Sequence, residues 1–356
     1  MNKKVFSDRI ISWYEQNKRP LPWRETRDPY KIWLSEIILQ QTRISQGLPY
    51  YEAFLSNFPD VYSLAKASQG NVLRLWQGLG YYTRARNLHA CAKKVVTDYG
   101  GVFPDSYSAL LTLPGIGAYT AAAVASIAFG ESVAVVDGNV FRVLSRVFGI
   151  DKDIASNKGK EYFFIKANEL IPDRQPDVYN QAVMEFGALH CTPVNPKCQT
   201  CPLSDFCVAN LRNLQHLLPV KSKKQKSKRR YFTYLVISSN GRLLMRKREP
   251  GDIWQGLYDF ALLESKRPIR VKDLGRQQKE FKNLEIGSIS TTYKHVLSHQ
   301  QLITRFVLAR IRSSKTTQAL KKRYKLKSYT RQQVDRLPKP ILVNRFLKES
   351  GFFKEP

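Results

Sequence analysis

Apolar residues recur at intervals of three and four positions through most of residues 1–217. This spacing lines them up along one face of an α-helix, so each sustained stretch predicts a helix. Segments rich in Gly and Pro, such as NFPD and DYGGVFPDS, separate the stretches and end the helices. The predicted helices cover Val5–Tyr14, Ile32–Gln41, Tyr50–Phe58, Val72–Leu75, Arg84–Asp98, Tyr107–Leu113 and Ala118–Phe129.

The pattern changes after residue 230. The run YFTYLVI, the dipeptide Asn240-Gly241 and the run RLLMRKR predict a β-hairpin, while TTYKHVL and QQLITRFVLARI predict further strands. The segment VNRFLKESGFF predicts a closing helix. We therefore expect a helical domain over residues 1–217 and an α+β domain over residues 231–356. Residues 218–230, whose last ten include seven Lys or Arg, are expected to form a basic linker.

The chain is strongly basic, with a formal charge of +29 over 356 residues. Residues 1–220 carry 24 basic and 19 acidic side chains, whereas residues 231–356 carry 27 and 10. Such a field favours a polyanionic partner, which is nucleic acid or, as the alternative, an anionic membrane surface. Tyrosines are interleaved with cations in the run Lys321–Arg331, a composition suited to phosphate contacts.

The N-terminus lacks the apolar core of a signal peptide. The most apolar run, Ala118–Val136, is interrupted by Thr, Ser, Gly and Glu and is typical of a buried helix, not of a membrane span. We therefore expect an intracellular protein without a membrane partner, cytoplasmic and associated with the nucleoid. In that compartment the five cysteines are not expected to form disulfides.

The segment LPGIGAYTAAA joins a Pro-Gly-x-Gly turn directly to an alanine-rich helix that starts at about Ala118. Gly115 and Gly117 let backbone N–H groups approach a ligand, and the helix adds its own unpaired N–H groups and the positive end of its dipole. This arrangement is typical of a phosphate site. The alternative is an ordinary turn between two packed helices.

Four of the five cysteines, Cys191, Cys198, Cys201 and Cys207, fall within seventeen residues at the spacing C-x6-C-x2-C-x5-C. Four thiolates this close in sequence can converge on one centre, which indicates zinc or an iron–sulfur cluster. The spacing alone leaves both open. Cys91 lies in a helical pattern and is expected to be a small buried apolar residue.

Several motifs resemble those of one enzyme superfamily. LPGIGAYTAAAVASIAFG, VAVVDGNVFRVLSR and the four-cysteine segment are similar to the helix-hairpin-helix DNA glycosylases, whose endonuclease III branch holds a [4Fe–4S] cluster on this spacing. LPWRETRDPYKIWLSEIILQQTR and GLGYYTRARNLH resemble the adenine DNA glycosylase (MutY) family, and the resemblance covers about residues 5–215. It implies a mainly helical helix-hairpin-helix glycosylase domain with an iron–sulfur cluster loop, followed by a MutT/Nudix-like α+β domain.

The resemblance implies a monofunctional DNA glycosylase of base excision repair. Such an enzyme would act as a monomer on double-stranded DNA and hydrolyse the N-glycosidic bond of adenine mispaired with 8-oxoguanine or guanine. The alternatives are a bifunctional endonuclease III-like glycosylase/lyase, a thymine- or pyrimidine-directed glycosylase, and a non-catalytic DNA-binding protein. Tyr119 argues against the lyase, because it stands where bifunctional relatives carry the lysine that attacks the sugar.

Two acidic residues carry the implied chemistry. Glu36 lies in the apolar run WLSEIIL, where burial would raise its pKa and let it act as an acid near neutral pH. The resemblance implies that Glu36 protonates the departing adenine, while Asp137 stays ionised and stabilises the positive charge that develops on the sugar. Asn139 and Tyr119 would orient these groups. Asp137 could also serve as the N-cap of the helix that follows it.

An enzyme of this kind must turn its target base out of the duplex. The resemblance implies that Gln41 and Thr42 face the orphaned partner base, and that Tyr81, beside Leu79 and Gly80, wedges into the base stack. The loop with Gly115 and Gly117 would hold a backbone phosphate and an alkali cation. The implied adenine pocket consists of Arg19, Trp23, Arg24 and Gln181, with a plain core role as the alternative for Trp23.

The second domain lacks the glutamate-rich helix with which Nudix hydrolases hold magnesium, so we expect it to read DNA. In the family, an aromatic-Ser-His triplet of this domain recognises 8-oxoguanine. The matching triplet here is Leu297-Ser298-His299, in which leucine replaces the aromatic residue. Ser298 and His299 keep their hydrogen-bonding groups. The alternative is a polar turn between two strands.

Overall fold

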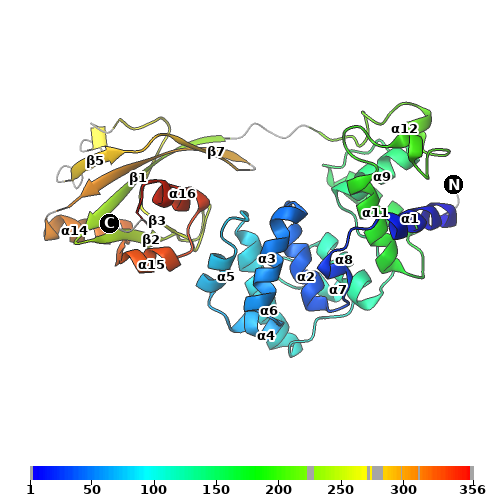
Figure 1. Cartoon of the computed structure of the whole chain (residues 1–356), viewed down its shortest axis with the longest axis horizontal. Coiled ribbons are helices and arrows are strands. Elements are labelled where there is room, and N and C mark those ends of the chain that lie inside the picture. The colour runs from blue at the N-terminus through cyan, green and yellow to red at the C-terminus, as the bar shows by residue number, and fades with distance from the viewer. Residues whose placement is uncertain are drawn as a thin grey trace. The chain divides into compact units, whose positions relative to one another are not determined.

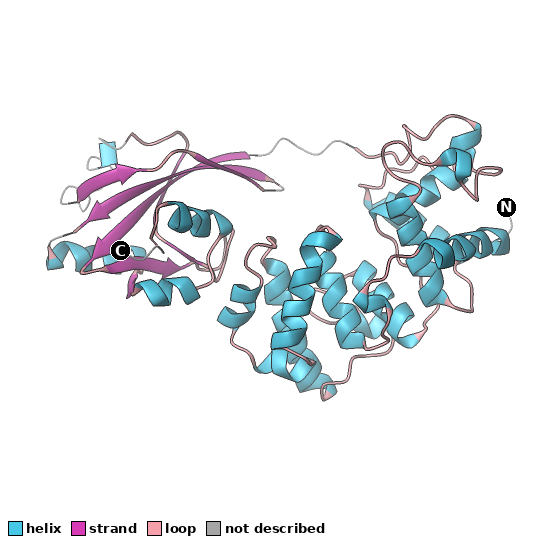
Figure 2. Ribbon diagram, viewed as in Figure 1, coloured by secondary structure: helices cyan, strands magenta, loops and turns pink. Residues whose placement is uncertain are grey.

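The computed structural model describes residues 3–222, 228–270, 273–274, 284–297, 299–311 and 313–352. The chain separates into two compact units, Met1–Lys66 with Asn87–Lys223 and Ala67–Arg86 with Lys224–Pro356 (Figure 1). The first unit is helical and the second is built on a sheet (Figure 2). This confirms the predicted fold class, while the predicted boundaries at residues 217 and 230 stay a prediction.

Every helix predicted in the first 217 residues is present, with differences at the ends. The helix predicted over Tyr107–Leu113 ends at Leu110, because Leu113 precedes Pro114 and the residue before a proline disfavours helical backbone. The helix predicted to reach Gln41 ends at Leu39, since the backbone leaves the helical conformation at Gln40 (φ −54°, ψ 114°) and Gln41 is left-handed (φ 56°). The elements are α1 (Lys3–Asn17), η1 (Pro22–Arg24), α2 (Pro29–Leu39), α3 (Ile44–Asn57), α4 (Val61–Lys66), α5 (Gln69–Leu75), α6 (Thr83–Tyr99), α7 (Tyr107–Leu110), α8 (Ala118–Phe129), α9 (Gly138–Phe148), α10 (Asn157–Leu170), α11 (Pro176–Leu189), η2 (Cys198–Thr200) and α12 (Val208–Leu211).

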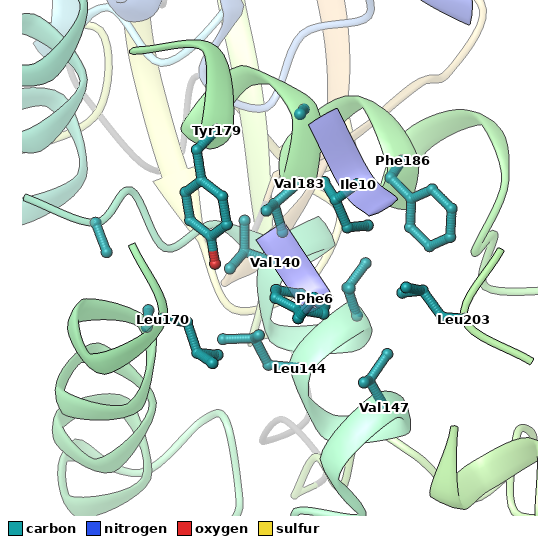
Figure 3. Close-up of a cluster of buried hydrophobic side chains, with 14 of the residues drawn as sticks. Phe6, Ile10, Val140, Leu144, Val147, Leu170, Tyr179, Val183, Phe186 and Leu203 are labelled. Carbon is teal, nitrogen blue, oxygen red and sulfur yellow. The ribbon is translucent and has the colours of Figure 1, made fainter. Parts of the chain in front are cut away.

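One hydrophobic core joins α1, α9, α10 and α11 (Figure 3). Phe6 of α1 lies fully buried in it, and Val140 and Leu144 of α9 lie in the same cluster. The Phe6 ring meets the Tyr179 ring edge-to-face, with centroids 6.3 Å apart. Burial of a large apolar side chain contributes about 1.5–3 kcal/mol, so this core fixes the start of α9, where Asp137 is the N-cap.

The helices α2 and α8 pack against each other and carry two of the predicted catalytic residues. α2 is buried along most of its length, and α8 buries every residue from Thr120 to Ile127. Helices that are apolar on nearly all sides must lie inside the protein. The alanines of α8 are small, so the two helices can approach closely enough to bring Glu36 opposite Tyr119.

The second unit contains a mixed sheet with eight described strands, in the order β3-β2-β1-β7-β5; in addition β4 pairs with β1, β6 with β7 and β8 with β2. The predicted hairpin forms between β1 and β2, and positive φ angles at Asn240 (48°) and Gly241 (70°) suit its type I′ turn. β1 and β7 run parallel. The elements are β1 (Lys228–Ser239), β2 (Arg242–Lys247), β3 (Tyr258–Asp259), β4 (Ala261–Ser265), β5 (Glu285–Ile289), β6 (Tyr293–Val296), β7 (Gln300–Arg310), α14 (Ser314–Tyr324), β8 (Lys327–Tyr329), α15 (Arg331–Arg336) and α16 (Ile341–Glu349).

The C-terminal part of the second unit differs in detail from the prediction. The closing helix, α16, starts two residues early at Ile341 and ends at Glu349, because Gly351 adopts a left-handed conformation just beyond it (φ 71°). The basic run Lys321–Arg331 spans the end of α14, all of β8 and the first residue of α15. None of the helices in the described ranges combines the length and the apolar composition that a bilayer crossing requires.

Candidate active site

Glu36 and Tyr119 form a direct hydrogen bond in the first unit. The Tyr119 hydroxyl donates to Glu36 Oε2 at 2.6 Å and lies 3.6 Å from the sulfur of Met184 on α11. Glu36 is only 8% exposed. The acid predicted from the apolar run WLSEIIL is therefore buried beside a hydroxyl donor.

The surroundings of Glu36 set its protonation near neutral pH. Burial raises the pKa of its carboxyl to about 7, and the negative charge of Asp137 acts in the same direction. The hydrogen bond from Tyr119 and the positive charge of Arg24 oppose this increase. Burial and the neighbouring carboxylates raise the pKa of Tyr119 well above its usual value, so its hydroxyl remains a donor.

Asp137 caps α9 and is itself held by three donors. Its Oδ1 accepts from the backbone N–H groups of Asn139 and Val140, both at 2.8 Å, and its Oδ2 accepts from Asn139 Nδ2 at 2.8 Å. Burial raises the pKa of Asp137, and these donors together with the charge of Arg142 offset that increase only in part. The side chain is therefore the N-cap and, at the same time, an oriented carboxylate whose charge acts on Glu36.

Arg142 connects this carboxylate to the cysteine segment. Its Nη2 donates to Asn139 Oδ1 at 2.8 Å and to the Gly187 carbonyl at 2.6 Å, and its Nε donates to the Cys191 carbonyl at 2.7 Å. A Cβ atom on Gly187 would lie 2.6 Å from Asn139 Cβ, so only glycine allows α11 to approach α9 this closely. Arg142 and Gly187 were not among the predicted site residues, although a charged residue within the apolar pattern VFRVLSRV indicates a buried polar role.

The four cysteines predicted to bind a metal line one cavity, together with Arg146, His190 and Gln215. Among the described residues, no three His, Cys, Asp or Glu side chains form a group arranged to hold a single metal ion. N–H donors face three of the sulfurs: Arg146 Nη1 lies 3.5 Å from Cys191, Leu203 N lies 3.4 Å from Cys201, and Gln215 Nε2 lies 3.9 Å from Cys198. A set of four thiol ligands with N–H donors to the sulfurs fits an iron–sulfur cluster. Cys91 is fully buried and lies apart from the cavity lining.

The four residues predicted for the adenine pocket all have partners in the first unit. Arg19 and Arg24 each form two-pronged hydrogen bonds to Glu185, with distances from 2.5 to 3.1 Å. Gln181 Oε1 accepts from the Tyr14 hydroxyl at 3.0 Å, and the buried Trp23 ring packs edge-to-face on Tyr51. The adenine pocket therefore stays a prediction.

Glu185, which was not among the predicted site residues, is the centre of this group and is 1% exposed. Burial alone would raise the pKa of its carboxyl, but the hydrogen bonds from Arg19 and Arg24 outweigh burial and hold it at about 2. Its sequence signal was the one that revealed Glu36, an acidic residue within an apolar helical pattern.

The loop residues predicted to contact DNA in the first unit have distinctive backbones. Gln41 is exposed with a positive φ angle, and Thr42 Oγ1 donates to the Gln40 carbonyl at 3.3 Å. Gly115 has a φ of 76°, and a Cβ atom there would lie 2.5 Å from Asn87 Cβ. Gly117 is the N-cap of α8, and a Cβ atom there would meet nothing within 4 Å. The first turn of α8 is therefore open beside Gly117.

The remaining predicted DNA contacts belong to the second unit. Leu79 is buried, Gly80 has a φ of 74°, and Tyr81 is 50% exposed with a φ of 47°. Leu297 donates its backbone N–H to the Gln300 carbonyl at 2.8 Å, and His299 is exposed. Ser298 lies outside the described residues.

Three family profiles match the chain: the HhH-GPD superfamily base excision DNA repair protein at residues 34–172, the iron-sulfur binding domain of endonuclease III at residues 191–207, and the NUDIX domain at residues 233–349. A solved thermostable thymine-DNA glycosylase is 33% identical, with a TM-score of 0.55, and the match covers 59% of this chain and 97% of that chain. A solved non-covalent endonuclease III–DNA complex is 21% identical, with a TM-score of 0.51, and the match covers 60% of this chain and 99% of that chain. At this identity the likeness supports the fold alone. The chain is a base excision repair protein of the HhH-GPD superfamily, with an iron–sulfur binding domain and a C-terminal NUDIX domain.

Relatives of known function narrow this class. The adenine DNA glycosylase of Buchnera aphidicola subsp. Baizongia pistaciae (strain Bp) is 37% identical over 309 residues, and the match covers 85% of each chain. That of Homo sapiens is 43% identical over 223 residues, which are 60% of this chain and 41% of that protein. This chain belongs to the adenine DNA glycosylase family. The family and the enzyme class predicted from the motifs are confirmed.

Proposed function

We propose that this monofunctional glycosylase hydrolyses the N-glycosidic bond of adenine paired with 8-oxoguanine or guanine in double-stranded DNA. One observation carries the proposal: the buried Glu36 carboxyl, with a pKa of about 7, meets the Tyr119 hydroxyl and the charge of Asp137 in one site. A carboxylic acid that is partly protonated near neutral pH can protonate a leaving group, and a fixed carboxylate can stabilise a developing cation.

The steps follow from these groups. After the adenine has been turned out of the duplex, Glu36 gives its proton to the purine ring, and the bond between the ring and C1′ breaks with its electron pair leaving on the base. Asp137 stabilises the positive charge on the sugar, because its oxygens are already fixed by Asn139 and Val140. Water then adds to C1′ and returns a proton to the Glu36 carboxylate.

Tyr119 explains why the reaction stops after base removal. A lysine at this position would attack the sugar as an amine and form a Schiff base, which leads to strand cleavage. A phenol forms no such adduct, and the Tyr119 hydroxyl is occupied by its hydrogen bond to Glu36. The product we propose is therefore an abasic site in an intact strand.

We assign the contacts with DNA to the residues that the sequence predicted for them. Gln41 and Thr42 face the partner base, Tyr81 enters the stack, and the open first turn of α8 beside Gly117 takes a backbone phosphate with an alkali cation. His299, exposed at the β6–β7 turn, reads 8-oxoguanine together with Ser298. The charge of +29 supports tight, salt-dependent binding.

The cavity lined by the four cysteines supports a [4Fe–4S] cluster. The thiolates of Cys191, Cys198, Cys201 and Cys207 would hold the cluster, which would then cross-link residues 191–207. In the chain itself, Arg146 links this segment to a later residue, because it donates to the carbonyl of Thr192 within the segment and to that of Gln215 beyond it, both at 2.7 Å. We propose that the enzyme acts as a monomer inside the cell, on nucleoid DNA.

A single-turnover assay on a duplex with adenine opposite 8-oxoguanine tests the proposal. We expect adenine release without a strand break until alkali is added. A break before alkali would support a lyase, and binding without product would support a non-catalytic protein.

Asp137→Asn should lower the rate of adenine release by roughly 10²–10³, because the stabilising charge is lost. The exposed Asp173→Asn is the control, and full activity in Asp137→Asn would contradict the proposed role.

A further inference from the structure

The loop that carries Tyr81 is held in one conformation by its own unit. We call residues 77–82, between α5 and α6, the wedge loop. Trp76 Nε1 donates to the Gly80 carbonyl at 3.0 Å, and the Arg84 guanidinium lies 5.0 Å from the Trp76 ring and 5.7 Å from the Tyr81 ring. Positive φ angles at Gly78, Gly80 and Tyr81 make the turn tight. The loop therefore presents an exposed aromatic ring on a fixed backbone.

A single residue from the C-terminal part of the chain bonds to both ends of the wedge loop. The backbone N–H of Lys339 donates to Gln77 Oε1 at 2.9 Å, and the Lys339 carbonyl accepts from the Tyr82 hydroxyl at 3.4 Å. The Tyr82 hydroxyl also accepts from the Gly78 N–H at 3.4 Å. Both ends of the loop are thus attached to the backbone of one residue of the NUDIX domain.

The Lys339 backbone is itself rigid. It lies between Pro338 and Pro340, whose rings fix their own φ angles and restrict the residue before each of them. Burial lowers the pKa of its fully buried side chain to about 8, so the ammonium is still charged at pH 7. That ammonium donates to three backbone carbonyls at and beyond the end of α15, those of Val334, Asp335 and Leu337.

A second connection starts on α6, the helix that follows the wedge loop, and leads toward the turn to which the proposed function assigns the recognition of 8-oxoguanine. Arg86 Nη1 on α6 donates to the Gln255 carbonyl at 3.0 Å. The neighbouring Trp254 ring lies 5.9 Å from the His295 ring on β6, the strand that leads into the turn with His299. The wedge loop and this turn are therefore connected within one compact unit.

We propose that Lys339 positions the wedge loop, so that the domain that reads the partner base also aims the aromatic ring that opens the base stack. This inference rests on the proposed function. Lys339 and Gln77 are positioning residues, because their effect on the reaction passes through Tyr81. Their loss should slow the turning-out of adenine and leave the chemistry at Glu36 unchanged.

The test uses the full-length enzyme and a duplex in which the fluorescent base 2-aminopurine replaces the adenine opposite 8-oxoguanine. Stopped-flow fluorescence then measures how fast this base is turned out of the duplex. Gln77→Leu removes the acceptor for the Lys339 N–H and should slow the fluorescence rise by about twofold to tenfold, the range for one hydrogen bond. Gln77→Glu keeps an oxygen at the same place and should restore the rate to within about twofold. Gln16→Leu, at an exposed position of α1, is the matched control.

A double-mutant cycle with Tyr81→Ala separates positioning from a general loss of structure. If Gln77→Leu acts through the wedge, it should have no further effect in the Tyr81→Ala background. Equal slowing in both backgrounds, or no slowing by Tyr81→Ala itself, would overturn the inference. If Gln77→Leu fails to fold, Tyr82→Phe, which removes only the hydroxyl at the other end of the loop, enters the same cycle. A wild-type enzyme that releases no adenine would instead refute the proposed function before any variant is compared.

Discussion

Two buried glutamates in the first unit have opposite surroundings. Glu36 faces the neutral Tyr119 hydroxyl and a neighbouring carboxylate, whereas Glu185 faces the guanidinium groups of Arg19 and Arg24. The pKa of Glu36 is raised to about 7, and that of Glu185 is lowered to about 2. Burial is therefore not what distinguishes the two. The charge of the partner decides whether a buried glutamate can keep a proton at neutral pH.

The two carboxyl groups therefore have different roles. An ion pair shared with two arginines fixes Glu185 as an anion, and that anion ties residues 19–24 to α11. A single neutral donor leaves the charge of Glu36 adjustable, which an acid that must lose and regain a proton requires. The contrast can be tested at each of the two residues.

The largest effect is expected on the rate, from Glu36→Gln. The amide has nearly the same shape but no proton to give, so single-turnover adenine release should fall by roughly 10²–10⁴. Glu52→Gln, at an exposed position of α3, should leave the rate unchanged and serves as the control. A rate for Glu36→Gln close to that of the wild type would mean that another group supplies the proton.

The next effect is expected on stability, from Glu185→Gln. Removing this carboxylate leaves Arg19 and Arg24 without their counter-charge, and loss of one partner of a buried pair costs about 3–5 kcal/mol. We expect the lower end of that range, because the Arg19 side chain is 36% exposed and can reach water. The melting temperature measures it. Glu15→Gln, which breaks an exposed pair with Lys18, should change it little, and an equal effect of both would contradict the assignment.

The smallest effect is expected from Tyr119→Phe, as a shift in how the rate of adenine release depends on pH. Glu36 acts while it is protonated, so the rate should decline as pH rises through about 7. In Tyr119→Phe the carboxylate loses a hydrogen bond that lowers its pKa, so this decline should move to higher pH. Single-turnover rates across pH measure the shift. Tyr162→Phe, at an exposed position of α10, is the control, and a decline that moved to lower pH would reverse the role given to Tyr119.

Local patterns predicted the helices and the hairpin well, because a helix or a tight turn depends on residues close in sequence. Asn240-Gly241 needs only its own backbone preferences to form the turn between β1 and β2. The same local rules predicted that Asp137 could cap α9. They overextended the segment before Pro114, where the proline restricts the preceding residue.

Long-range contacts could not be predicted in this way. Glu185 and Arg142 are polar positions in apolar helices, and only the folded chain shows that one joins two arginines and the other joins Asn139 to the Cys191 carbonyl. The grouping of Ala67–Arg86 with Lys224–Pro356 is the clearest case. Nothing in the pattern of that segment indicates a partner beyond residue 250.

That grouping has a consequence for the order in which the protein is made. The backbone partners of Arg86 and Gln77 lie 169 and 262 positions later in the chain. At a synthesis speed of 5–20 residues per second, the segment emerges from the ribosome roughly 10–50 s before it can complete these bonds. The rest of the helical part can therefore fold early. The segment Ala67–Arg86 can complete its contacts only after the C-terminal residues have been synthesised.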